Sequence, residues 1–174
     1  MSAKPYIGHL DLNHAGPEQK AAYDEELRLR GRMTNMKRTL AHSPVALRVY
    51  GEWFALRDAL APVIGDRAVL TLCLAISFEM DNIVGMAFMR RGLAGLNKET
   101  PAIAIDLGSI EDFGRAFASD AKTIPQALWS KLSQVLPEKA LVDLTALAGI
   151  MMATNAFMDA VGTEPDPELA DFIA

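Results

Sequence analysis

The chain has 174 residues, of which 51% are hydrophobic and 22% are charged, and this size predicts one domain with a substantial buried core. The net charge of −5 and the lack of any block of Lys and Arg argue against nucleic-acid binding through phosphate neutralisation. The single cysteine, Cys73, excludes an internal disulfide and a multi-cysteine metal site, and it is typical of a reducing environment. We therefore expect a cytoplasmic protein without a metal or another cofactor.

The N-terminal part is predicted to be an extended arm followed by two helices. Residues 1–16 lack a helical pattern and are expected to form a mobile arm. Pro17 suits the first turn of the next helix, which Gly31 ends. Thr34 is a suitable cap for a short helix that extends to His42.

A third helix is predicted to begin at Ser43 and Pro44, which combine an N-cap with a first-turn proline. It ends between Pro62 and Gly65. Its apolar side chains recur at helical spacing and predict one buried face, formed by Ala46, Val49, Tyr50, Trp53, Leu56 and Leu60.

The central stretch, residues 66–93, is almost entirely apolar but carries Glu79, Asp81 and Asn82 in its middle. Acids in an apolar helix need a functional or structural reason, because burying a charge is costly. In one continuous helix the two acids would point about 200° apart and could not face one pocket. A break in the helix, with Ser77 or Asp81 as the new N-cap, would change these directions.

The rest of the chain is predicted to form three further helices and an acidic tail. These helices begin at Ser109, at Thr123 with Pro125, and at Pro137. The last helix is apolar on nearly all sides up to Gly162, which predicts that it is fully buried or packed against another subunit. Residues 163–174 are expected to lie over the surface or to be disordered.

No stretch shows the alternation of a strand, so the predicted fold class is all-α, with a single domain over residues 17–162. Neither of the two longest apolar helices offers about 20 uninterrupted apolar residues, which argues against a membrane span. Acids in the middle of one helix, and Thr154 and Asn155 in the other, favour buried helices instead.

Three phrases occur in a consistent order within residues 17–168. They are GRMTNMKRTLAHSPVAL at 31–47, the central stretch, and LVDLTALAGIMMATNAFMDAVGTEPD at 141–166. Together they resemble the carboxymuconolactone decarboxylase and alkylhydroperoxidase-D-like family. The resemblance implies an all-α helical bundle that assembles with itself, as a dimer to a hexamer.

The peroxidase branch of that family carries Cys-x-x-Cys, a His four residues later and a Glu about three turns upstream. One thiolate attacks, the second resolves the intermediate, and the Glu and His relay protons. Aligned from Arg91-Gly92-Leu93, the cysteine positions fall on Ser77 and Met80; aligned from Arg67, the first one falls on Met80. Neither alignment restores the thiols, the histidine or the glutamate, so the resemblance implies a degenerate redox site.

The decarboxylase branch lacks the cysteine pair but keeps an acid and a histidine for proton transfer. The central stretch of this chain has no histidine. His42 could contribute only through the fold or from a neighbouring subunit, and the simpler interpretation is a surface residue at a helix end.

Glu79, Asp81 and Cys73 are the candidate catalytic residues. A carboxylate buried among Leu, Ile and Met would have a raised pKa and could act as a general acid or base. The structural alternative pairs Glu79 with an arginine, such as Arg90 or Arg91, and makes Asp81 a helix cap. Cys73 lies on a helix face that is predicted to be buried, where a thiol is normally inert.

Asn82, Met86 and Asn155 are the candidate ligand-binding residues. Asn155 and its neighbour Thr154 could hydrogen-bond across to the acids, or they could form a polar seam that fixes the register of the helices. The methionines of both helices are expected to serve mainly as packing residues.

Three functions stay open from the sequence. The first is acid–base chemistry on a small carboxylic acid or lactone, with Glu79 as the reacting group. The second is a peroxidase-like antioxidant role through Cys73. The third is a non-catalytic binding or assembly protein on the same scaffold, which the missing histidine favours and the retained acids argue against.

Overall fold

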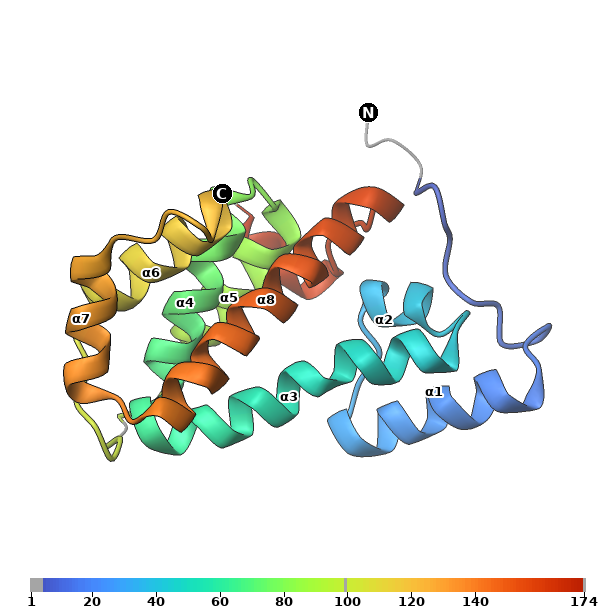
Figure 1. The fold of residues 1–174 in the computed structure, drawn as a ribbon. Helices are drawn as coiled ribbons and strands as arrows, with labels where there is room; N and C mark the ends of the chain where they lie inside the picture. The colour runs from blue at the N-terminus through green and yellow to red at the C-terminus, as the bar shows by residue number, and fades with distance from the viewer. Residues whose placement is uncertain (1–4, 99, 174) are drawn as a thin grey trace.

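The computed structural model describes residues 5–98 and 100–173, and over these ranges the chain is helical and contains no strand. The prediction of an all-α fold is confirmed (Figure 1). The elements in chain order are α1 (Pro17–Arg30), α2 (Asn35–Leu40), α3 (Pro44–Ile64), α4 (Asp66–Glu79), α5 (Ile83–Ala94), α6 (Leu107–Asp120), α7 (Gln126–Val135), α8 (Glu138–Val161) and the short 3-10 helix η1 (Pro167–Phe172).

Local chemistry sets the ends of most helices. Gly31 ends α1 in the left-handed region, with φ 74°, and Ser43 caps α3 through its hydroxyl, both as predicted. Helix α6 begins earlier than expected, because its cap is Asp106 and not Ser109. The Asp106 carboxylate accepts hydrogen bonds from the backbone N–H groups of Gly108 and Ser109.

The central stretch is broken into two helices rather than continuous. Helix α4 ends at Glu79, and Asp81 adopts a left-handed conformation with φ 54°, so the chain turns a corner there. The cap of α5 is Asn82, whose side chain accepts a hydrogen bond from the backbone N–H of Gly85 at 2.6 Å. Of the two alternatives left open by the sequence, a continuous helix or a break, the structure has the break, but neither Ser77 nor Asp81 is the new cap.

Helix α4 is the centre of the main core, because α3, α5, α6 and α8 all pack against it. Its side chains are therefore apolar on nearly every side. The large, fully buried residues of this core include Leu72 and Ile76 of α4 and, from the other helices, Leu60, Ile110, Phe113, Leu132, Leu144 and Leu147. Helix α8 is buried only on its inner face, since Val142 on the outer face is 66% exposed.

The N-terminal part forms a second, smaller core against the first half of α3. Met33, Leu40 and Leu47 are buried there, and Figure 1 shows α1 and α2 beside that half of α3. The predicted mobile arm is tied to the body where it is described. The backbone N–H of Tyr6 donates to the carbonyl of Val161 at 2.9 Å, and that of Leu10 donates to Arg38 at 3.0 Å. The first four residues of the predicted arm lie outside the described ranges.

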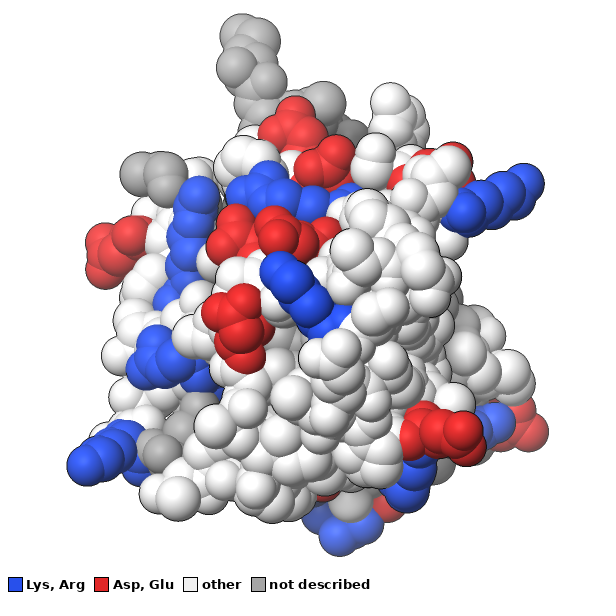
Figure 2. Space-filling view, turned by 60° about the vertical axis from the view of Figure 1, so that its left-hand side comes forward, with Lys and Arg blue, Asp and Glu red and all other residues white. Residues whose placement is uncertain are grey.

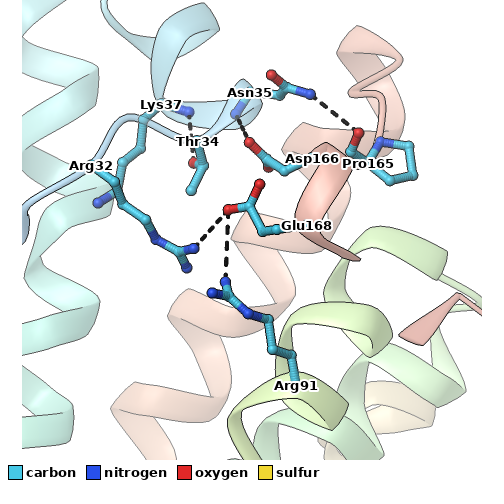
Figure 3. A network of polar contacts seen from close by, with 8 residues as sticks. All are labelled: Arg32, Thr34, Asn35, Lys37, Arg91, Pro165, Asp166 and Glu168. Carbon is cyan, nitrogen blue, oxygen red and sulfur yellow. Dashed lines mark hydrogen bonds and ion pairs between the residues drawn. The ribbon is translucent and has the colours of Figure 1, made fainter. Parts of the chain in front are cut away.

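The described part of the C-terminal segment packs across α5 and reaches α2 (Figure 3). Of the two alternatives from the sequence, the structure therefore has the segment laid over the body of the protein. Leu169 of η1 is fully buried. The Asp166 carboxylate accepts a hydrogen bond from the backbone N–H of Asn35 at 2.9 Å, at the start of α2. Glu168 accepts one from Arg32 at 2.8 Å. The segment thus joins the C-terminal part of the chain to the start of α2.

Two surface properties bear on the sequence predictions. Within the described ranges, α8 is the one helix long and apolar enough to cross a membrane by length and composition, and its inner face packs against α3 and α4. On the face shown in Figure 2, Lys and Arg side chains alternate with Asp and Glu, and a broad area between them carries neither charge.

Candidate functional site

The two central acids lie on the surface and not in the core. The Glu79 side chain is 34% exposed, and its carboxylate lies 3.9 Å from the guanidinium of Arg115 on α6. Arg115 also stacks over the ring of Phe78 at 4.3 Å. Asp81 is exposed at the corner between α4 and α5. The prediction of buried acids is therefore wrong, because the corner turns both side chains outward.

The structural alternative for Glu79 was a pair with an arginine, and such a pair is present. The partner is Arg115, however, and not Arg90 or Arg91. An exposed pair at this distance contributes little to stability. Asp81 does not cap α5. A catalytic role for either acid remains a prediction. The geometry does not support it, because neither Glu79 nor Asp81 lines the cavity described below.

Cys73 is sealed in the core, as predicted, with no exposed surface. Burial raises the pKa of its thiol to about 12, although a contact with Trp53 acts in the opposite direction. The reactive form of a cysteine is the thiolate, which this environment suppresses at neutral pH. Cys73 therefore has the properties of a packing residue.

Asn82 and Asn155 are brought together, in a buried polar cluster at the corner of α4 and α5. The Asn82 amide donates to the backbone carbonyl of Asn155 at 3.3 Å and to the carboxylate of Asp159 at 2.6 Å. The Asn155 amide donates to the hydroxyl of Ser77 at 3.1 Å, and that hydroxyl donates to the carbonyl of Cys73 at 2.9 Å. The Asn82 amide thus bonds to α8, and the Asn155 amide bonds to α4; neither bonds to Glu79. The polar-seam interpretation fits this geometry.

Gly85 shows how completely the cluster fills the space at the corner. A Cβ atom at this position would lie 2.5 Å from Oδ1 of Asn155, 2.6 Å from Oγ of Ser77 and 3.0 Å from Oδ1 of Asn82. No side chain larger than hydrogen fits without a shift of these groups. Amide and hydroxyl groups therefore fill the corner at which the helix breaks.

The remaining predicted residues lie apart from this cluster. Met86 is half-buried on α5 and is not part of the cavity wall. His42 is exposed at the end of α2, as the simpler interpretation predicted, and its ring lies 3.1 Å from the backbone carbonyl of Gly8. In the described part of the chain, no group of three His, Cys, Asp or Glu side chains could hold a metal ion.

A cavity of about 370 Å³ lies between α1, α2, α3, α4, α5 and α8. This volume is within the range of small-molecule sites. Most of its wall is apolar and comes from Leu40, Leu47, Tyr50, Trp53, Phe54, Leu70, Phe88, Met89, Met151 and Met158. Gly85 is also part of the wall, so the polar cluster lies directly behind the cavity. The sequence prediction missed this site, because its wall comes from segments far apart in the chain.

Charged side chains add a basic character to the apolar wall. Arg30, Arg32, Lys37 and Arg57 contribute to it, and Glu26 is the carboxylate among the lining residues. Glu26 and Lys37 form a buried ion pair with 2.5 Å between Oε1 and Nζ, and each side chain is only 10% exposed. A buried ion pair is costly to desolvate, so a pair in the wall of a cavity is a candidate for a functional role.

Comparison with known proteins confirms the fold. No protein-family model and no curated protein match the chain. A solved structure of a cysteine-to-alanine variant of the debrominase Bmp8, in complex with 2,3,4-tribromopyrrole, has a TM-score of 0.74, with 13% identity over 100% of both chains.

Two further solved structures have a similar fold over nearly their whole length. An uncharacterised peroxidase-related protein from Silicibacter sp. TM1040 has a TM-score of 0.73, with 15% identity over 99% of each chain. An uncharacterised peroxidase-related protein from Ralstonia eutropha JMP134, described as an alkylhydroperoxidase AhpD core, has a TM-score of 0.62, with 16% identity over 96% of each chain. The chain therefore has the alkylhydroperoxidase-D-like fold that its sequence phrases indicated.

Proposed function

We propose that the protein binds a small, mostly apolar carboxylic acid or lactone in the cavity, without thiol chemistry. The observation that carries this proposal is the cavity itself, an aromatic and aliphatic space of about 370 Å³ with cationic side chains in its wall. Apolar walls supply affinity for a small molecule, and a few polar groups orient it.

Proteins of this fold support the proposal by analogy. The Bmp8 variant holds a small halogenated aromatic molecule, and it shares its fold with this chain. A peroxidase-like role has less support, because the thiol of Cys73 is buried and its pKa is raised to about 12. We therefore favour binding over redox chemistry.

Glu26 supports a second candidate function, acid–base chemistry on the bound molecule. It is a lining carboxylate, whereas Glu79 is on the outer surface. In this role the Glu26 carboxylate would take a proton from the carbon next to the ligand's carbonyl, Lys37 would balance the charge of the enolate, and the proton would return to carbon. The step needs no other reactant.

Trp53 allows a direct test of binding, since it lines the cavity and the chain has only two tryptophans. In a Trp129→Phe variant, Trp53 is the sole source of tryptophan fluorescence. We expect 4-bromobenzoate or 4-bromobenzamide to quench it saturably, because a bromine atom in contact with an indole quenches its emission.

A pair of glycine substitutions makes this test specific. Gly51 lines the cavity, and a Cβ added there meets nothing closer than Glu26 at 4.0 Å, so Gly51→Leu should fill the space and abolish quenching. Gly8→Leu in the N-terminal segment is the control, because its Cβ has no neighbour within 4 Å and the position does not line the cavity. Equal quenching in both variants, or none in the parent at millimolar probe, would contradict the proposal.

A further inference from the structure

Within the part of the chain that the structure describes, three of the four cationic side chains in the cavity wall form an ion pair with a carboxylate, and the fourth does not. Lys37 pairs with Glu26, Arg32 with Glu168 at 2.8 Å, and Arg57 with Asp66 at 2.6 Å. Arg30 has no ion pair with any acid among the described residues.

Arg30 is nevertheless held in place. It is the last residue of α1, and its guanidinium carbon lies 4.1 Å from the centroid of the Phe54 ring. This stacking fixes the plane of the guanidinium and leaves its edges, which carry the N–H groups, free to bond. Its Nε atom is buried and has no hydrogen-bond partner. A buried donor without an acceptor is costly, and the described part of the protein supplies no acceptor for this one.

Glu26 is one helical turn before Arg30 on α1, but its carboxylate is committed to Lys37. Lys37 also lies 4.9 Å from the centroid of Phe54, so two cations share that ring. One carboxylate thus faces two cations at this end of the cavity, and the local charge stays positive.

We infer that Arg30, stacked on Phe54, is the residue that binds the carboxylate of the ligand and makes the cavity select an ionised acid over its neutral counterparts. This inference rests on the proposed function and narrows it, since a neutral lactone or amide would leave the Arg30 donors without an anionic acceptor. Arg30 is thereby a specificity-determining residue, and the apolar part of the ligand lies against the aromatic wall.

Isothermal titration calorimetry with 4-bromobenzoate and 4-bromobenzamide tests the inference, because the two probes share a ring and differ in charge. We expect the parent protein to bind the acid at least about 10-fold more tightly than the amide, the size of effect that a charge-assisted hydrogen bond produces. Arg30→Gln should remove this preference by weakening acid binding, and it should leave amide affinity within about twofold.

Arg28→Gln is the matched control, because Arg28 is on the same helix, is paired with Glu25 at 2.7 Å and does not line the cavity. Arg30→Lys keeps the charge but loses the planar fork, so it should show an intermediate preference. It also serves as the deciding variant if Arg30→Gln does not fold.

The outcomes separate the inference from the proposed function. Equal affinity for acid and amide in the parent, or an unchanged preference in both Arg30 variants, would overturn the role of Arg30 while the cavity still binds small molecules. Failure of both probes to bind would overturn the proposed function, and the inference with it. A preference lost in the Arg30 variants and kept in Arg28→Gln supports both.

Discussion

Three side-chain oxygens converge on the space beside Gly85, and they explain how the corner between α4 and α5 is held. Ser77 comes from α4, Asn82 caps α5 and Asn155 comes from α8, so the cluster joins three helices. Ser77, Asn82 and Asn155 are each at most 1% exposed. Buried polar groups that satisfy one another specify a single arrangement of helices, because any shift leaves a group unpaired.

Gly85→Ala should therefore destabilise the protein by about 1–3 kcal/mol, although alanine is normally the better helix residue. The added methyl would lie within 3 Å of the oxygens of the polar cluster. Gly149→Ala is the control, since its Cβ meets nothing within 4 Å, and we expect it to stabilise the protein by about 0.5–1 kcal/mol. Urea unfolding measures both, and a change of the same sign in the two variants would contradict this account.

At the scale of elements, the C-terminal segment acts as a cap for a helix far away in sequence. The first N–H groups of a helix have no partner within it, and Asp166 supplies one for Asn35 at the start of α2. Glu168 holds Arg32, which lines the cavity, and it lies 3.7 Å from Arg91 of α5 (Figure 3). The segment therefore positions part of the cavity wall.

Asp166 gives this contact a pH dependence. Its side chain is buried, and burial raises the pKa of its carboxyl above the ordinary value of 3.8. Glu168 acts in the same direction, and the Asn35 N–H, Arg32 and Arg38 act against it. A raised pKa in the folded state means that folding favours the protonated acid. The contribution of Asp166 to stability is therefore fully present below pH 3.8 and is lost as the pH rises through the folded pKa.

Asp166→Asn should lack this loss, because its amide oxygen still accepts the hydrogen bond and carries no charge. We expect the free energy of unfolding of the variant, relative to the parent, to rise between pH 3.8 and neutrality. Asp171→Asn is the control, because Asp171 is an exposed residue of the same segment and the substitution removes the same charge. A constant difference across this pH range would contradict the expectation.

At the scale of the whole molecule, α8 is apolar on nearly all sides but is covered on only one. Val142 is 66% exposed on a helix whose inner residues Leu144 and Leu147 are fully buried. An exposed apolar helix face is typical of a surface that another subunit covers. We therefore keep, as a proposal, the self-association that the sequence indicated.

Light scattering tests this proposal against a monomer mass of 18.9 kDa. We expect the parent to have the mass of a dimer or larger and Val142→Glu to reduce it, because a charge in an apolar interface is costly to bury. Val135→Glu on α7 is the control, since Val135 is 45% exposed and lies on another helix. A monomer mass for the parent would end the proposal.

Local signals were sufficient to predict the fold class and several helix ends. Gly31, Ser43 and Gly162 act through their own backbone or side-chain geometry, so their roles can be inferred without knowing the rest of the molecule. The burial of Cys73 was predictable for a related reason, because it lies within an unbroken apolar part of α4.

The placement of the acids was not predictable in this way. Whether Glu79 is buried depends on where the chain turns, and that turn depends on the fit of Asn82 and Gly85 against α8. The hydropathy pattern indicates that most residues near Glu79 in sequence are apolar, but it does not indicate the direction in which the Glu79 side chain points.

The sequence by itself determined an all-α chain of the alkylhydroperoxidase-D-like fold without the thiol pair of that fold's redox branch, since helical periodicity and residue identity are local properties. Only the tertiary structure decided where a ligand site can be. The cavity joins Arg30 of α1 to Phe54 of α3 and places both opposite α5 and α8. Such a site arises from packing between distant segments, and no pattern along the chain encodes which side chains will meet.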